Sequence, residues 1–151
     1  MELFVLDSSI PLATGEGGTE QVAWLEAALA SSNARWKVGL MHQPPYSSGH
    51  HGSHLEIRDV VQPLFARYGV DVAFTGHDHH YERTTAQDGV VWIVSGAGAK
   101  LTRVDGADFT AHAESTLQFM LIRIDGDIMD VRAITTDGTV IDQVTLRARA
   151  G

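Results

Sequence analysis

Short apolar runs and helix-like apolar spacing alternate in the first half of the chain. Apolar runs occupy residues 2–6, 36–41 and 70–75, and each ends at or just before a polar, turn-forming segment. Runs of this length predict buried strands. The order strand, helix, strand, helix, strand predicts an α/β fold with a parallel sheet.

Two helices are predicted between these strands. The first spans residues 19–30 with Thr19 as its cap, and its core-facing positions are Val22, Leu25 and Leu29. The second begins at Ser53, because Ser53 and Glu56 have the spacing of a capping box, and it ends at Gly69. Its core-facing positions are Ile57, Val60, Val61, Leu64 and Phe65 or Tyr68.

The second half of the chain changes to a pattern of strands joined by tight turns. Strand-like runs occupy 90–95, 116–124, 128–134 and 140–146. The Asp-Gly pairs at 88–89, 125–126 and 137–138 are typical hairpin turns, so we predict antiparallel pairing. Residues 96–100 form a glycine-rich loop, and the polar stretch 105–114 is predicted to be a mobile loop. With no repeat or linker, residues 1–151 are expected to form a single domain.

Composition narrows the function classes. The chain has 151 residues and 44% apolar content, which suits one globular core. A net charge of -8 argues against binding to a nucleic-acid backbone or an anionic membrane surface. The chain has no cysteine, so thiolate metal sites and disulfides are excluded, and any metal must be held by nitrogen and oxygen ligands. No localisation is predicted.

Histidine placement is the strongest chemical signal in the sequence. Seven of the eight histidines lie between His42 and His80. His42 and His77 each follow a predicted strand, and the carboxyl ends of parallel strands share one edge of a sheet. His77 and His79 have one residue between them, so both side chains can face one site. Imidazole suits transition metals such as Zn, Fe, Mn or Co, and we predict such a metal at His42, His77 and His79.

The neighbouring polar residues have alternative interpretations. Among His50, His51 and His54, one histidine is a candidate general acid, while a solvated loop and a helix start are the alternatives. Tyr46, His50 and Arg83 are candidates for binding substrate, or else Tyr46 and Arg83 close an edge of the core. Asp7 and Asp78 are candidates for orienting a ligand imidazole. The alternatives are a loop cap for Asp7 and a surface position for Asp78, and His80 is expected to pack or to face solvent.

Three stretches carry a family resemblance: WKVGLMHQPPYSSGHHGS, VQPLFARYGVDVAFTGHDHHYERT and VWIVSGAGAK. They resemble the calcineurin-like metallophosphoesterase superfamily, in particular its purple-acid-phosphatase-like branch. The resemblance implies half of a metallophosphoesterase-type α/β sandwich, with a parallel βαβαβ start followed by antiparallel strands. It also implies that His42 and His77 bind one metal, that His79 binds the other, and that His51 protonates the leaving group of a phosphomono-, di- or triester.

Family members carry further metal motifs, D-x-H, G-D and G-N-H-E, before the position that corresponds to His42. None of these motifs precedes His42 in this chain. We therefore expect the site to be completed by oligomerisation, most simply in a homodimer paired through an exposed sheet face or edge. A single metal held by three histidines is a second route. The alternatives to a hydrolase are a non-catalytic metal-binding or assembly protein, and a fragment of a longer phosphoesterase.

Overall fold

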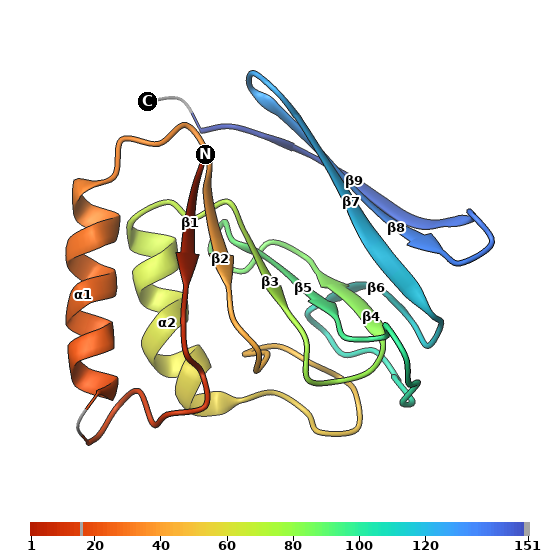
Figure 1. Ribbon diagram of the computed structural model, residues 1–151, viewed down its shortest axis with the longest axis horizontal. Coiled ribbons are helices and arrows are strands. Elements are labelled where there is room, and N and C mark those ends of the chain that lie inside the picture. The colour runs from red at the N-terminus through yellow and green to blue at the C-terminus, as the bar shows by residue number, and fades with distance from the viewer. Residues whose placement is uncertain (16, 150–151) are drawn as a thin grey trace.

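The computed structural model describes residues 1–15 and 17–149. Within them, the chain forms two helices and nine strands (Figure 1). Their bounds are β1 Glu2–Val5, α1 Gly18–Ser31, β2 Lys37–Leu40, α2 Leu55–Arg67, β3 Val72–Thr75, β4 Tyr81–Thr84, β5 Val91–Ser95, β6 Thr110–Glu114, β7 Gln118–Asp125, β8 Ile128–Thr135 and β9 Val140–Arg147.

The strands form two sheets. The larger has six strands in the order β1-β2-β3-β5-β4-β6, and the smaller has the order β7-β8-β9. Strands β1, β2, β3 and β5 are parallel, whereas β4, β6 and the whole small sheet pair in antiparallel fashion. The predicted α/β fold, with a parallel start and antiparallel strands after it, is therefore confirmed.

The large sheet lies between two different layers. Helices α1 and α2 lie side by side on one face, and the small sheet covers part of the other face (Figure 1). Buried side chains such as Phe4, Leu29 and Phe65 fill the space beneath the helices. A second cluster, which includes Ile93 and Met129, joins the two sheets. The chain thus has three layers. The strands of the middle layer end at the loops that carry the candidate site (Figure 1).

Both helix starts differ from the sequence prediction. Helix α1 is capped by Gly17, whose N–H donates to the Glu20 carboxylate (2.6 Å), so Thr19 lies inside the helix. Helix α2 is capped by His54, whose Nδ1 accepts the Ile57 N–H (3.4 Å). A neutral imidazole nitrogen is an acceptor and can replace a hydroxyl in this role. The predicted stop at Gly69 is confirmed, with a positive φ of 71°.

Two strands were not predicted: β4, and β6, which lies in the stretch 105–114 that was predicted to be a mobile loop. Strand β4 pairs with β5 across the Asp88-Gly89 turn, and β6 pairs with β4 as the edge of the large sheet. Both strands are rich in polar residues, so apolar periodicity gave no signal for them. The polar side chains of β4 are largely buried, against partners that the sequence pattern does not reveal, whereas β6 is half-buried or exposed.

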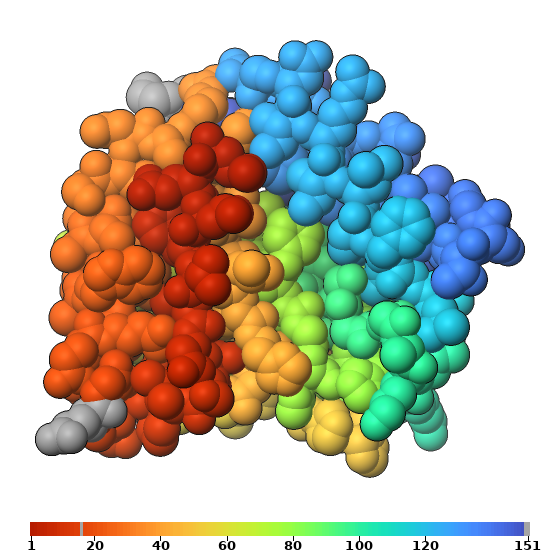
Figure 2. Space-filling model, viewed as in Figure 1, coloured from red at the N-terminus to blue at the C-terminus, as the bar shows by residue number. Residues whose placement is uncertain are grey.

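The face of the large sheet that the helices leave open is only partly covered. Between the sheets lies an apolar groove of about 470 Å³, here called the open groove, and Figure 2 looks onto it. Strand β1 ends the large sheet and β7 ends the small one, and both border this groove. Its lining residues are Met1, Leu3, Val38, Leu40, Phe74, Thr75, Ser95, Met120, Ile122, Ile124 and Met129. In residues 1–15 and 17–149, neither helix is long and apolar enough to cross a membrane.

Candidate functional site

The loops that follow β1, β2 and β3 meet at one edge of the large sheet. The buried Ser8 hydroxyl, just after β1, accepts the N–H groups of His42 (3.1 Å) and Gln43 (3.0 Å). The carbonyl of His42 in turn accepts the Gly76 N–H (2.9 Å). The topology therefore brings His42 and His77 together as predicted. Ser8 was missed by the sequence reasoning, because a serine in a polar loop gives no signal of its own.

His42 and His77 form a close pair of imidazoles. Nε2 of His42 lies 3.2 Å from Nδ1 of His77, and the rings meet edge to face with centroids 5.1 Å apart. His77 holds a positive φ of 64°, a conformation that costs energy for a residue with a side chain. Such strain is often found at functional sites. Here it accompanies the placement of the His77 ring against that of His42.

The pair continues into a row of imidazoles. The ring of His51 lies 4.5 Å from that of His77, and the ring of His50 lies 5.0 Å from that of His51. Burial, followed by the nearby charges of His51 and His42, lowers the pKa of His77. The lowered pKa favours the neutral form of His77, which is the form that binds metals. His42, His50 and His51 are exposed, so the row is open to small molecules.

The distance between the two nitrogens suits a shared metal ion. Metal–nitrogen bonds of roughly 2.0–2.1 Å in tetrahedral geometry place two ligand nitrogens about 3.4 Å apart. The 3.2 Å between His42 and His77 is a hydrogen-bond distance and is also close to the spacing of two adjacent positions on one ion. Among residues 1–15 and 17–149, no group of three or more His, Cys, Asp or Glu side chains is arranged to hold a metal. His79 lies in the same loop as His77. Its N–H donates to the Thr102 hydroxyl (3.1 Å), and its carbonyl accepts the Thr102 N–H (2.9 Å).

Asp78 does not have the surface position that was one alternative for it. Its side chain is fully buried. The carboxylate accepts the Ser47 hydroxyl (2.5 Å) through one oxygen and the His51 N–H (2.9 Å) through the other. Asp78 therefore fixes the loop that carries His50 and His51, and this contact is made to the backbone of His51 and not to an imidazole ring.

A second buried carboxylate, Glu82, holds the same loop. It accepts the N–H and the hydroxyl of Ser48 (both 2.8 Å), the hydroxyl of Thr110, and it contacts Nε2 of His80 (3.2 Å). Burial alone raises the pKa of Glu82, but the bonds from His80, Ser48 and Thr110 outweigh it, so the pKa lies below its usual value. His80 is fully buried, in agreement with a packing role. Glu82 was not identified from the sequence, because the polar strand that carries it gives no apolar signal.

Two of the candidate substrate-binding residues lie elsewhere. Tyr46 is only 9% exposed and packs against Trp92 and Phe109, with the Arg58 guanidinium 4.1 Å above its ring. It closes the core, which was the alternative for it. Arg83 donates two hydrogen bonds to Asp142 on β9 (2.6 and 3.0 Å), so its guanidinium is occupied between the sheets.

The remaining candidates are His50 and Asp7. His50 is exposed beside His51, within reach of an incoming ligand. Asp7 accepts the N–H (2.9 Å) and hydroxyl (2.6 Å) of Ser9, and these bonds lower its pKa. This is the geometry of a loop cap. The rings of His50, His51, His77 and His42 thus form a continuous row at this edge of the sheet.

Comparison with known proteins shows similarity to a phosphoesterase family. The profile of the calcineurin-like phosphoesterase family matches residues 4–81. Purple acid phosphatase 17 of Arabidopsis thaliana is 39% identical over 82 residues, which cover 54% of this chain and 24% of that protein. Tartrate-resistant acid phosphatase type 5 of Homo sapiens is 34% identical over 78 residues, which cover 52% of this chain and 24% of that protein. The chain thus spans about a quarter of the length of these curated relatives.

Solved structures share the fold at lower identity. Purple acid phosphatase PPD1 from yellow lupin seeds superposes with a TM-score of 0.84 at 23% identity, covering 95% of this chain and 30% of that one. GAP50, described as the anchor in the inner membrane complex of Plasmodium, has a TM-score of 0.86 at 18% identity, covering 97% of this chain and 49% of that one. The chain therefore spans about half or less of each of these solved chains.

Proposed function

The chain belongs to the calcineurin-like phosphoesterase family, and we propose that it takes part in metal-dependent hydrolysis of phosphoesters. The observation that carries the proposal is the pair of His42 and His77, whose ring nitrogens lie 3.2 Å apart at the carboxyl ends of two parallel strands. Its purple acid phosphatase relatives support the same reaction class.

His42 and His77 would hold a transition-metal ion, such as Zn, Fe, Mn or Co, through Nε2 and Nδ1. A bound ion of this kind lowers the pKa of a coordinated water and offsets the charge that develops on the phosphoryl oxygens. His79 is proposed as the ligand of a second ion, as the family resemblance implies. The low pKa of His77 favours this role, because a neutral imidazole need not lose a proton before it binds.

His51 is proposed as the proton donor. Its exposed ring lies 4.5 Å from that of His77, so a phosphoester bound at the histidine pair meets it directly. The protonated imidazole gives its proton to the ester oxygen as the phosphorus–oxygen bond breaks, and the alcohol leaves uncharged. His50, beside it, would bind the substrate phosphate. The net charge of -8 favours small phosphoesters over a polyanionic backbone.

We further propose that a second polypeptide unit completes the coordination. Within residues 1–15 and 17–149, the ligands do not form a group of three, and the open groove presents Leu3, Leu40 and Ile122 beside two unpaired strand edges. Exposed apolar patches with open edges favour association. A second copy of the chain in a homodimer is the proposed occupant. The remainder of a longer phosphoesterase is the alternative.

The test is hydrolysis of chromogenic phosphomonoesters and phosphodiesters by the purified protein. Activity is expected to disappear with a chelator and in His77→Ala, and to persist in His112→Ala, which changes a histidine outside the cluster. Activity that survives both the chelator and His77→Ala would refute the proposal. Metal binding without hydrolysis would instead favour the non-catalytic metal-binding role.

A further inference from the structure

We propose that Asp78 is a positioning residue for His51. Asp78 lies between His77 and His79, yet its carboxylate reaches across to the loop that follows β2. One buried side chain thus joins the loop of the candidate metal ligands to the loop of the candidate proton donor. A role for this contact in catalysis rests on the proposed function. Its role in fixing the loop does not depend on that function.

The contacts of Asp78 fix the loop at two points. Its oxygens accept the Ser47 hydroxyl at 2.5 Å and the His51 N–H at 2.9 Å, so the chain is held on both sides of Gly49 and His50. Asp78 is fully buried. Hydrogen bonds to a buried carboxylate are stronger than those between neutral groups. Loss of the carboxylate would also leave the His51 N–H without its acceptor.

Glu82 and Gly49 fix the loop further. Glu82 accepts the N–H and hydroxyl of Ser48 at 2.8 Å each. A methyl group at Gly49 would lie 2.2 Å from Cε1 of His80 and 3.0 Å from Cγ of Asp78. The backbone therefore lies directly against these side chains, and only glycine permits so close an approach.

Fixing the backbone matters because the His51 side chain itself is exposed. Few contacts hold an exposed side chain, so its position depends largely on its backbone. The ring lies 4.5 Å from that of His77, and proton transfer is sensitive to shifts of about 1 Å, which can cost roughly 10²-fold in rate. Asp78 thus acts on the reaction through His51 and not by touching the substrate.

The first test measures amide hydrogen exchange at His51 in Asp78→Ala and Asp78→Asn. Asp78→Ala is expected to speed exchange at His51 by about tenfold or more, because the amide loses its acceptor. Asp78→Asn should retain most of the protection, because its side-chain oxygen still accepts the bond.

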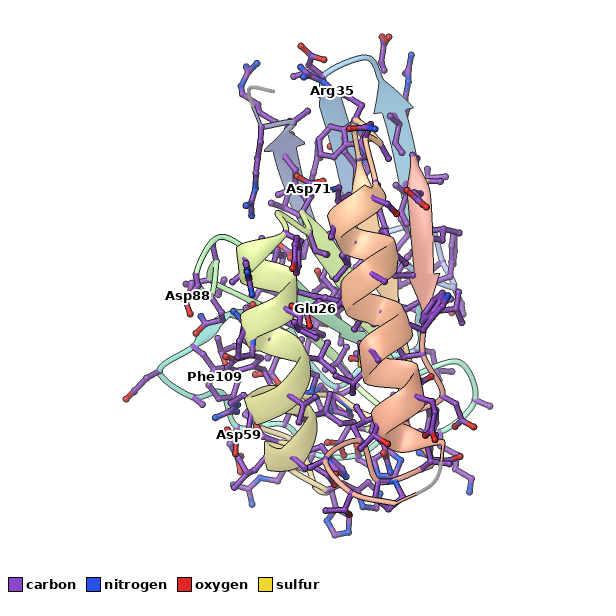
Figure 3. All side chains as sticks on the ribbon, turned by 90° about the vertical axis from the view of Figure 1, so that its left-hand side faces the viewer. Glu26, Arg35, Asp59, Asp71, Asp88 and Phe109 are labelled. Carbon is purple, nitrogen blue, oxygen red and sulfur yellow. The ribbon has the colours of Figure 1, made fainter. Side chains whose placement is uncertain are left out.

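The matched control is Asp71→Ala. Asp71 is also a buried aspartate that accepts a backbone N–H, from Lys37 at 2.9 Å. It lies just before β3, at the opposite end of that strand from Asp78, and Figure 3 shows it far from Phe109, which contacts Tyr46 of the loop. Asp71→Ala should leave His51 exchange unchanged. Unchanged His51 exchange in Asp78→Ala would overturn the inference.

The second test compares aryl and alkyl phosphoesters. An alkoxide is a poor leaving group and needs the proton from His51 more than a nitrophenolate does. Asp78→Ala and His51→Ala should each lower kcat at least tenfold more for the alkyl ester than for the aryl ester. The double variant should show nearly the same alkyl-to-aryl difference as His51→Ala alone. Equal losses on both esters would contradict a positioning role. If the wild type hydrolyses neither ester, the proposed function fails, and the exchange experiment alone decides whether Asp78 holds the loop.

Discussion

Removal of Asp142 should weaken the contact between the two sheets and destabilise the protein. Asp142 on β9 accepts the Tyr81 hydroxyl (2.7 Å) and two bonds from Arg83 (2.6 and 3.0 Å), both on β4. The Arg83 and Asp142 side chains are only 17% and 10% exposed. Asp142→Ala therefore leaves a mostly buried guanidinium and a buried phenol without their acceptor.

The expected cost follows from this burial. Breaking a buried ion pair by removing one partner costs about 3–5 kcal/mol. Because Arg83 retains some access to water, we expect a loss of about 2–4 kcal/mol in the free energy of unfolding. Asp142→Asn keeps one acceptor oxygen and should lose about half of that. For a domain of this size, each kcal/mol shifts Tm by about 2–4 °C.

The assay is urea denaturation of the wild type and both variants across pH. Burial alone raises the pKa of Asp142, but the bonds from Arg83 and Tyr81 outweigh it and hold the pKa below its usual value. A carboxyl group with a lowered folded-state pKa contributes stability above its unfolded pKa of about 3.9 and loses it as the pH falls further. The difference between wild type and Asp142→Ala should be constant from about pH 5 to 8 and shrink below about pH 4. A variant within about 0.5 kcal/mol of wild type at pH 7 would refute the reasoning.

Three further changes test other parts of the structure. Gly49→Ala should destabilise the protein by about 1–3 kcal/mol, because its new methyl group would lie 2.2 Å from a buried imidazole carbon, whereas Gly98→Ala faces open space and should be neutral in thermal denaturation. His77→Gly should unfold no more easily than wild type, since glycine adopts a φ of 64° without strain, yet it should lose metal in a binding titration. Leu40→Lys places a charge in the open groove and should reduce self-association in sedimentation experiments, whereas Leu101→Lys, at a similarly exposed leucine outside the groove, should not.

The parts of the fold that repeat a simple pattern were predictable from sequence. The parallel start followed from apolar runs that alternate with helical spacing, and the Asp-Gly pairs marked the hairpins between β7 and β8 and between β8 and β9. The meeting of His42 and His77 followed from the rule that carboxyl ends of parallel strands share an edge. These predictions needed only local sequence and topology.

The parts that depend on a distant polar partner were not predictable. Arg83 was a candidate for binding substrate, but it bonds Asp142, which is 59 residues away in the sequence. Glu82 could be identified only from the structure, in which β4 places its carboxylate within hydrogen-bond distance of Ser48. A buried charge carries no periodic signal, because its stability comes from a partner whose position only the folded chain defines.

Metal binding by the histidine pair is the most direct test of the account. Transition-metal content and affinity would be measured for the wild type and for His42→Ala, His77→Ala and His112→Ala, of which His112 lies outside the cluster. We expect His42→Ala and His77→Ala to lose at least about tenfold in metal affinity, while His112→Ala binds metal like the wild type. Equal affinity in His77→Ala and the wild type would contradict the central claim that His42 and His77 hold a metal ion.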